Sequence, residues 1–338
     1  MRLEWIDRLK GLAIFLVVAG HFIQQHVWGG ESENNVLVRI IYTFHMPLFF
    51  FLSGYVSWLS PKSDFTFFKN KCRSILLPYI SWSLLYLLIL SPNSPSCNVN
   101  DYIYLVLPSI FDTHHYGGLY WFMRILFILQ VLLLAEKIII RFFKRGLLVH
   151  VYINILLCIV VFCIGILFKQ LSSIMFILHL LSFMLGYYCS QSNYFDRIID
   201  NKSIFYIALC TYIFAFLFYV PLTDRNIYHV IIAWSLKFLM ALTAIVCVMY
   251  LFRNIFTQNS RVNDSLKFFG QHSLLIYLVP MKFLPYQYMF PETCSSEGIA
   301  LITILYSTIR CYIVSYISIV LSLVPGINFI LCGKNKNI

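Results

Sequence analysis

The sequence predicts an all-α fold, a polytopic integral membrane bundle of about ten transmembrane helices with both termini in the cytoplasm. Hydrophobic side chains make up 60% of the 338 residues, whereas a soluble domain contains roughly 45–50%. Apolar runs of roughly 18–22 residues recur along the chain, and each can cross ~30 Å of hydrocarbon. Lys and Arg residues gather in alternate connections between these runs. These observations exclude one large soluble core.

The apolar runs place the spans in chain order. They lie near residues 11–28, 37–59, 74–91, 119–140, 149–168, 172–190, 203–221, 228–251, 268–290 and 299–331. The first run has the length of a signal-peptide core, but no small-residue cleavage site follows and His21 is unsuited to such a core. It is therefore expected to be retained. Because no repeat, low-complexity tract or Gly/Ser linker interrupts the series, residues 1–338 are predicted to form one membrane-embedded domain without an appended soluble domain.

The positive charge of the chain, +11 at pH 7, follows the predicted topology. With the amino terminus inside, the inward-facing segments hold eighteen Lys and Arg residues, and the outward-facing ones hold only Arg39, Lys169 and Arg225. Cytoplasmic connections of membrane proteins are enriched in Lys and Arg in this way. The lipid bilayer therefore accounts for the charge, and no nucleic acid partner is expected.

The ten cysteines do not predict a metal site. They form no CxxC pair and no Cys/His spacing typical of metal ligands, and most lie inside apolar spans. No metal is therefore expected. Cys97 and Cys294 are both predicted on the outer side, which leaves a disulfide between their connections open.

One face of the first span joins a cation to an imidazole. His21 follows Lys10 by eleven residues, which at ~100° per residue is about three turns plus ~20°, so both side chains share a face. At ~1.5 Å per residue, His21 lies ~16 Å deeper than Lys10, near the middle of the bilayer. Ionisable groups inside spans are costly and usually line functional cavities. The stripe predicts a cytoplasmic anchor for an anion connected to a base at mid-membrane.

The second span adds another histidine. His45 follows Arg39 by six residues, which places it ~9 Å into the bilayer from the outer side. A short connection makes the first two spans antiparallel neighbours, so His21 and His45 are expected at similar depth. Two neutral imidazoles could divide proton transfer and the orientation of a reacting group. The alternative is a His45 ring that hydrogen-bonds a neighbouring backbone carbonyl.

Four cations lie within spans, whereas no Asp or Glu lies in a span interior. They are Arg124, Lys237, Lys282 and Arg310. The two lysines can extend their ammonium groups toward the surface. Arg124 and Arg310 have less reach, so they predict either a water-filled crevice or an anionic ligand. Arg73, just before the third span, is placed to hold a phosphate at the membrane surface.

At these positions the sequence resembles the acyltransferase family 3 membrane proteins, which O-acetylate bacterial cell-surface polysaccharides. The resemblance begins with a basic residue and a histidine separated by ten residues, here Lys10 and His21 in "IDRLKGLAIFLVVAGH". Four further segments follow in order: "YTFHMPLFFFLSGY", "CRSILLPYISW", "GGLYWFMRILF" and "FFGQHSLLIYLVP". Together they extend from Asp7 to Pro280 and cover most of the chain.

The sequence departs from the family pattern at two points. The basic residue of the first span is Lys10 rather than the commoner Arg, which keeps the charge but loses a bidentate grip on phosphate. The late segment ends in Leu278, Val279 and Pro280, where many relatives have a His. His272 is one conceivable substitute for that group.

The resemblance implies that His21 is the catalytic histidine and that Lys10 is its companion. It also places four further residues near the site: His45, Ser53, Arg73 and Trp121. The implied protein is a multi-pass O-acyltransferase of the bacterial inner (plasma) membrane. It would transfer an acetyl group from cytoplasmic acetyl-CoA to a sugar hydroxyl of a surface glycan, such as an O-antigen or capsule, or of its lipid-linked precursor.

In this interpretation Lys10, Arg73 and Arg124 bind the donor, and His21 acts either as a general base or as a covalent acyl carrier. His45 or Arg124 would stabilise the negative charge that develops on the acyl oxygen. Tyr120, Trp121 and Arg310 would line the acceptor site on the outer side. The two aromatic residues could equally belong to an interfacial aromatic belt.

Two other classes of protein are possible. A transporter or flippase for an anionic or lipid-linked solute would also use intramembrane cations, but the sequence shows no inverted repeat and no matching pair of broken spans. A non-catalytic membrane scaffold would leave the shared face of Lys10 and His21 without a role.

Overall fold

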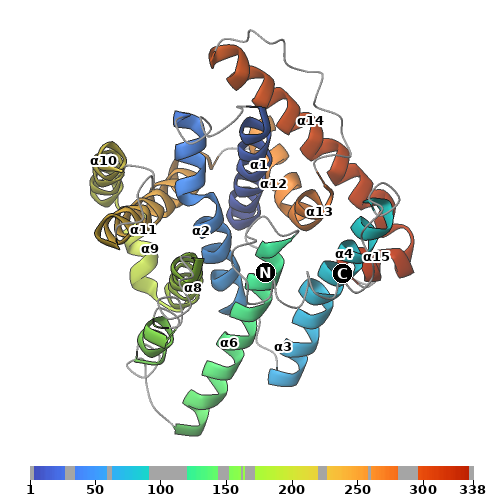
Figure 1. The fold of residues 1–338 in the computed structure, drawn as a ribbon, viewed down its shortest axis with the longest axis horizontal. Helices are drawn as coiled ribbons and strands as arrows, with labels where there is room; N and C mark the ends of the chain where they lie inside the picture. Colours follow the sequence, from blue (N-terminus) through green and yellow to red (C-terminus); the bar gives the residue numbers. More distant parts are fainter. Residues whose placement is uncertain are drawn as a thin grey trace. The chain divides into compact units, whose positions relative to one another are not determined.

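The computed structural model describes residues 4–26, 35–58, 63–90, 120–143, 152–160, 163, 172–219, 227–257, 260–280 and 296–334. Within these ranges every regular element is a helix and no strand occurs (Figure 1). The all-α prediction is confirmed for this part of the chain. The helices are α1 (Glu4–His26), α2 (Val36–Trp58), α3 (Asp64–Lys71), the π-helix η2 (Cys72–Leu76), α4 (Leu77–Leu90), α6 (Trp121–Phe143), α8 (Ser172–Cys189), α9 (Asn193–Ile199), α10 (Lys202–Phe218), α11 (Ile227–Tyr250), the π-helix η6 (Leu251–Ile255), α12 (Arg261–Gln271), α13 (Ser273–Leu278), α14 (Ser296–Ser322) and α15 (Pro325–Cys332). Residues 152–160 are also helical.

The helices form two compact units. The first unit consists of Met1–Tyr55 and Leu185–Val320, and the second consists of Val56–Met184 and Leu321–Ile338. Each unit is therefore assembled from stretches that are distant in the sequence. The expectation of a single membrane domain stays a prediction.

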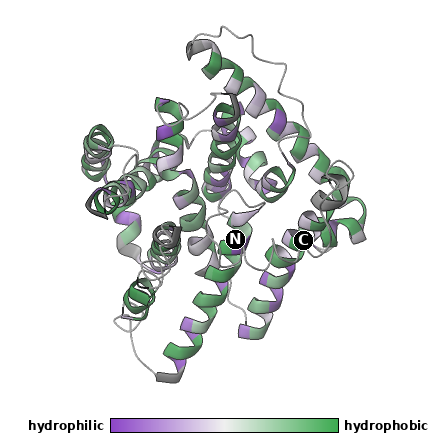
Figure 2. Cartoon of the chain, in the orientation of Figure 1, coloured by the Kyte–Doolittle hydropathy of each residue, from purple (hydrophilic) through white to green (hydrophobic). Residues whose placement is uncertain are grey.

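The described helices are those of a membrane protein. Three of them are long and apolar enough to cross a bilayer: Val36–Ser57, His229–Ile255 and Gly298–Ser322. Hydrophobic residues predominate along the helices (Figure 2), and large apolar side chains on α10 and α14 are exposed, among them Leu217 at 75% and Leu301 at 69%. Exposed apolar surface is unfavourable in water but not in lipid. The number of spans and the side of the termini stay predictions.

Three predicted spans are interrupted. The run expected at 299–331 is two helices, because α14 ends at Ser322 and α15 begins at Pro325 in the first turn, where a missing N–H has no cost. The run expected at 268–290 begins inside α12 and breaks at His272 before α13. The run expected at 74–91 begins inside η2 and continues as α4 from Leu77. Pro78 cannot donate to the carbonyl four residues earlier, and the preceding turn widens into a π-helix.

Small residues bring α1 close to its neighbours in the first unit. A Cβ on Gly11 would lie 1.8 Å from the Leu266 carbonyl oxygen of α12, and a Cβ on Gly270 would lie 1.8 Å from the Asp7 carbonyl oxygen of α1. The two helices therefore touch backbone to backbone, as in membrane helix pairs with small interfacial residues. Gly20 lets the Tyr42 side chain of α2 lie close to α1, since a Cβ on Gly20 would lie 2.9 Å from the Tyr42 ring.

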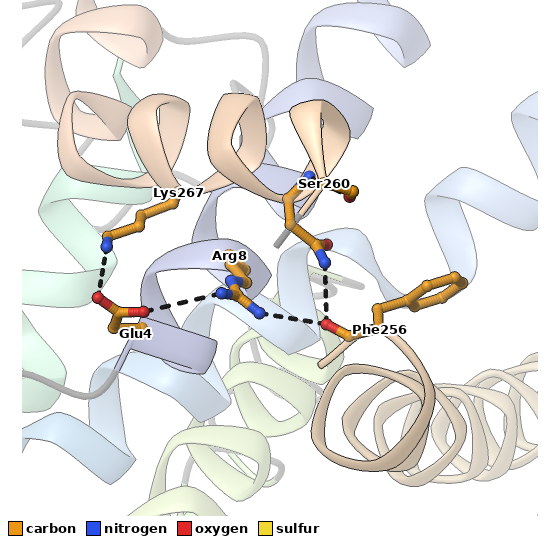
Figure 3. A network of polar contacts seen from close by, with 6 residues as sticks. Glu4, Arg8, Phe256, Ser260 and Lys267 are labelled. Carbon is orange, nitrogen blue, oxygen red and sulfur yellow. Dashed lines mark hydrogen bonds and ion pairs between the residues drawn. The ribbon is translucent and has the colours of Figure 1, made fainter. Parts of the chain in front are cut away.

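A polar network holds the first turn of α1 (Figure 3). Glu4 forms an ion pair with Lys267 of α12 and lies 3.7 Å from Arg8. Arg8 Nη1 donates to the Phe256 carbonyl oxygen at 3.2 Å, and Asn263 Nδ2 donates to the same oxygen at 3.0 Å. The network lies at the end of α1 that carries Lys10, so it fixes where this end meets the turn after η6.

Two features considered above lie outside the described residues. They are the candidate disulfide pair of Cys97 and Cys294, and Lys282 of a predicted span.

Candidate functional site

Lys10 and His21 lie on one uninterrupted helix. Because α1 extends from Glu4 to His26 without a break, the spacing of the two residues gives the shared face and the ~16 Å separation along the axis that the sequence predicted. Both side chains are half-buried. The start of the helix is anchored by the Glu4 network, and the end that carries His21 packs against α2 and α14 of the same unit.

His21 is bound to a tyrosine and an amide. Tyr42 Oη donates to Gln24 Oε1 at 2.7 Å, and His21 Nδ1 lies 3.5 Å from the same hydroxyl oxygen. The His21 and Tyr42 rings meet edge to face, with centroids 6.4 Å apart at 90°. Gly20 makes this contact possible, because a larger residue at that position would collide with the Tyr42 ring.

This arrangement favours one tautomer of a neutral His21. A tyrosine hydroxyl has one proton, and here that proton is directed to Gln24. The hydroxyl oxygen is then an acceptor toward His21 Nδ1, 3.5 Å away. In the tautomer with Nδ1 protonated, the other ring nitrogen, Nε2, has a free lone pair. A neutral imidazole with a free Nε2 lone pair is the form that a general base or a nucleophile requires.

His45 contacts the ring of the same tyrosine. Its ring centroid is 5.0 Å from that of Tyr42, and the side chain is buried with 5% exposure. Nδ1 lies 2.6 Å from the Ile41 carbonyl oxygen, so Nδ1 carries the proton because a carbonyl can only accept. The structure thus shows the backbone hydrogen bond that the sequence left as an alternative. A neutral His45 has only the acceptor Nε2 to offer a ligand.

Arg310 belongs to the same unit and is 1% exposed. It lies on α14, and its Nη2 donates to the Val279 carbonyl oxygen at 2.6 Å, where α13 has ended. One turn earlier, Tyr306 stacks on Phe22 of α1 with ring centroids 4.2 Å apart. This stacking places α14 against the segment of α1 that carries His21. The sequence assigned Arg310 to the acceptor side, and that assignment stays a prediction.

The remaining predicted site residues belong to the second unit. Arg73 is half-buried in η2, and Arg124 is buried in α6. Tyr120 has a left-handed backbone with φ of 62° immediately before α6, and Trp121 begins that helix. Trp121 stacks on His179 of α8 with ring centroids 5.5 Å apart at 24°. The structure thus brings Trp121 against a second buried histidine.

Several of these groups escaped the sequence analysis. Tyr42 and Gln24 are the most important, and each had a local signal, since Gln24 is one helical turn after His21 and Tyr42 is one turn before His45. Their contact across two helices had no such signal. In the second unit, buried Glu136 accepts from Asn154 Nδ2 at 2.9 Å.

Comparisons with known proteins identify the class of protein that this fold and site represent. Residues 3–323 match the family model of the acyltransferase domain of family 3. The class is therefore that of helical membrane proteins with an acyltransferase domain. The chain belongs to acyltransferase family 3, which confirms the resemblance seen in the sequence.

Two relatives are both named nodulation protein NolL. The chain is 30% identical to the protein from Mesorhizobium japonicum over 132 residues, which is 38% of this chain and 34% of the relative. It is 34% identical to the protein from Sinorhizobium fredii over 89 residues, which is 23% of each chain. The chain thus matches about a third and about a quarter of the length of these relatives. No solved structure matches the chain.

Proposed function

We propose that the protein is an integral membrane O-acyltransferase with about ten spans and cytoplasmic termini in a bacterial inner membrane. It transfers an acetyl group from acetyl-CoA to a sugar hydroxyl of a surface polysaccharide or its lipid-linked precursor. Membership of acyltransferase family 3 supports the reaction class. The observation that carries the proposal is the arrangement of Tyr42 and Gln24 around the half-buried His21, on the same helix as Lys10.

The donor approaches along α1. Lys10, at the cytoplasmic end, attracts the phosphates of acetyl-CoA, and the thioester extends along the shared face toward His21. The sequence also nominated Arg73 and Arg124 for donor binding; both belong to the second unit, and that assignment stays a prediction. No metal is required, because each step below uses only imidazole and guanidinium chemistry.

Two routes of acetyl transfer both use the Nε2 lone pair of His21. In the direct route, Nε2 takes the proton of the sugar hydroxyl while its oxygen attacks the thioester carbonyl, and the departing CoA thiolate then takes that proton. In the covalent route, Nε2 of His21 attacks the carbonyl carbon and expels the thiolate. The sugar oxygen then displaces the imidazole, and Nε2 of His45 accepts the hydroxyl proton and passes it to the thiolate.

The acceptor is a glycan that enters from the outer side. Tyr120 and Trp121 are suited to stacking on the apolar faces of sugar rings, and Trp121 already stacks on His179. Tyr120 and Trp121 would thus contact the sugar and not the acyl donor. Arg310, which the sequence also assigned to the acceptor, lies in the unit that holds His21.

The experiment compares ester-linked acetate on the surface glycan of cells that carry the wild type, His21→Gln or Lys10→Met at matched membrane abundance. His21→Gln is expected to abolish acetylation, and Lys10→Met is expected to raise the half-saturating acetyl-CoA concentration in membrane vesicles. His229→Gln is the matched control, because His229 is an exposed histidine of α11 in the same unit. Undiminished acetylation in His21→Gln contradicts the proposal.

The second candidate is a transporter or flippase for an anionic or lipid-linked solute. It is favoured by one observation, the fully buried cation Arg310. The same cells separate the two functions. The acyltransferase predicts unacetylated glycan exported in normal amount, whereas a transporter predicts that His21→Gln stops export itself.

A further inference from the structure

Arg310 has hydrogen-bond donors that no described residue uses. The guanidinium is bonded through Nη2 to the Val279 carbonyl and also interacts with the Tyr306 side chain, but buried Nε and Nη1 have no hydrogen-bond partner among the described residues. A buried guanidinium is expensive unless its donors are satisfied. Two donors on one rigid planar group, aligned by a third bond to the backbone, form a site for an oxygen that bears negative charge.

Two polar side chains near His21 already use their donors. Nδ1 of His45 donates to the Ile41 carbonyl, so a neutral His45 offers an acceptor only. The Tyr42 hydroxyl proton is directed to Gln24. Neither side chain donates to a developing oxyanion while these bonds are kept, and Arg124, the other residue that the sequence analysis gave this role, belongs to the second unit.

The position of Arg310 along α14 fits this role. Tyr306 stacks on Phe22, the residue after His21, and Arg310 lies one turn further on the same face, ~6 Å along the axis. Two residues later, Tyr312 packs on α12, the helix that meets Gly11 near the start of α1. Arg310 therefore lies at a depth between His21 and Lys10, on the path from the donor anchor to the base.

We propose that Arg310 donates hydrogen bonds to the acyl oxygen of the thioester and stabilises the oxyanion formed during transfer. The inference rests on the proposed acyltransferase function and assigns a further catalytic residue to the same site. As the nucleophile bonds to the carbonyl carbon, the carbonyl π pair moves to the oxygen and Nε and Nη1 of Arg310 solvate it. When the pair returns, the carbon–sulfur bond breaks and the thiolate leaves. No proton is exchanged with Arg310.

The test measures acetyl transfer from radiolabelled acetyl-CoA to glycan in inverted membrane vesicles, per amount of protein in the membrane. Arg310→Gln is expected to lower the maximal rate by about 100- to 1000-fold, the usual loss of an oxyanion donor. The half-saturating acetyl-CoA concentration is expected to stay near that of the wild type, because the interaction forms only in the transition state. Arg310→Lys, which keeps the charge but loses the fork, is expected to recover part of the rate.

A second measurement separates this role from a structural one. A thioether analogue of acetyl-CoA has no carbonyl oxygen, so its inhibition constant is expected to be equal in the wild type and Arg310→Gln. A weaker inhibition constant would show that Arg310 binds another part of the donor and would overturn the proposal. Loss of both variants from the membrane would show a structural role through Val279 and would overturn it too.

Arg39→Gln is the matched control, because Arg39 is an arginine of the same unit that donates to the Tyr219 carbonyl at 2.6 Å. Its maximal rate is expected to be unchanged. If wild-type vesicles transfer no acetyl group, the proposed function is wrong. If the wild type and Arg310→Gln transfer at equal rates, the function stands and the role of Arg310 is wrong.

Discussion

At the scale of single residues, the chemistry of His21 depends on a neighbour that the motif does not contain. The distance from His21 Nδ1 to Tyr42 Oη is 3.5 Å, long for a hydrogen bond, whereas Tyr42 holds Gln24 at 2.7 Å. The shorter contact orients the hydroxyl so that its oxygen faces His21 Nδ1 as an acceptor, which favours the tautomer with a proton on Nδ1. Tyr42 is a positioning residue in this arrangement, because it acts through the imidazole.

Replacing Tyr42 by Phe tests this dependence. The ring stays in place while the acceptor for Nδ1 disappears, so both tautomers of His21 become accessible. A hydrogen bond of about 1 kcal/mol corresponds to an expected five- to tenfold loss in the maximal rate of acetyl transfer. Tyr212→Phe is the control, because the Tyr212 hydroxyl lies 3.1 Å from Thr43 Oγ1 on another helix of the same unit. Equal rates in the two variants would contradict the role of Tyr42.

At the scale of helices, the contact between α1 and α12 positions the site. Gly11 and Gly270 each face a backbone carbonyl of the partner helix at a distance that no side chain can occupy. This contact fixes the position of α1 along its axis relative to α12. It thereby also fixes the depth of Lys10 and His21. The Glu4 to Lys267 ion pair and the Phe256 carbonyl close the same interface at one end (Figure 3).

A methyl group at this interface is expected to separate the helices. Gly11→Ala and Gly270→Ala should each destabilise the detergent-solubilised protein by about 1–3 kcal/mol, the usual cost of overpacking. Thermal unfolding followed by circular dichroism measures this. Gly326→Ala is the control, because a Cβ there meets nothing within 4 Å, and it should leave stability unchanged or raise it slightly. A Gly11→Ala midpoint equal to that of Gly326→Ala would contradict the close contact.

The ion pair at the start of α1 predicts a pH dependence. The hydrogen bond and charge of Lys267 lower the pKa of Glu4 from its usual value of 4.5. The stabilisation is therefore complete above pH 4.5 and is lost as the pH falls through the lowered value. Lys267→Met should unfold at a slightly lower temperature than the wild type at pH 7, and the difference should vanish on acidification. The effect is small because Glu4 is exposed, and a difference that grows in acid would contradict it.

At the scale of the whole molecule, each unit brings together segments that the charge pattern predicts on one side of the membrane. In the first unit, Arg253 lies 3.1 Å from Asp200, and both belong to inward-facing segments. In the second unit, Arg141 lies 2.6 Å from Asp64, again between two inward-facing segments. Ion pairs between these segments are expected if alternate connections of the chain lie on the same side of the membrane. The side itself is a prediction from the positive-inside rule.

Labelling from outside intact cells tests the predicted sides. A cysteine at Ser260, between η6 and α12, is expected to resist a membrane-impermeant thiol reagent and to react after the membrane is opened. A cysteine at Thr223, in the connection after α10, is expected to react in intact cells. The native cysteines are replaced first, and a variant without the new cysteine corrects for background. Labelling of Ser260→Cys in intact cells would show that the protein has the opposite orientation in the membrane.

The sequence by itself determined the helical class, the membrane character and the face shared by Lys10 and His21. These follow from hydropathy and helical periodicity, which depend only on residues close together in the chain. It also indicated the family, because the motif segments occur in order along the chain. The break at His272 and the π-helix before Pro78 were missed, because hydropathy does not report backbone hydrogen bonding.

The tertiary structure alone decided which groups surround His21. Tyr42, Arg310 and the carbonyl of Val279 come from helices that are far apart in the sequence. Their contacts depend on glycines that allow the backbones to approach, and no local pattern encodes which helix will fill the space. The same packing uses the only donor of a neutral His45 and leaves two donors of Arg310 to other groups. Long-range packing therefore decides the division of chemical roles among residues that the sequence could only nominate.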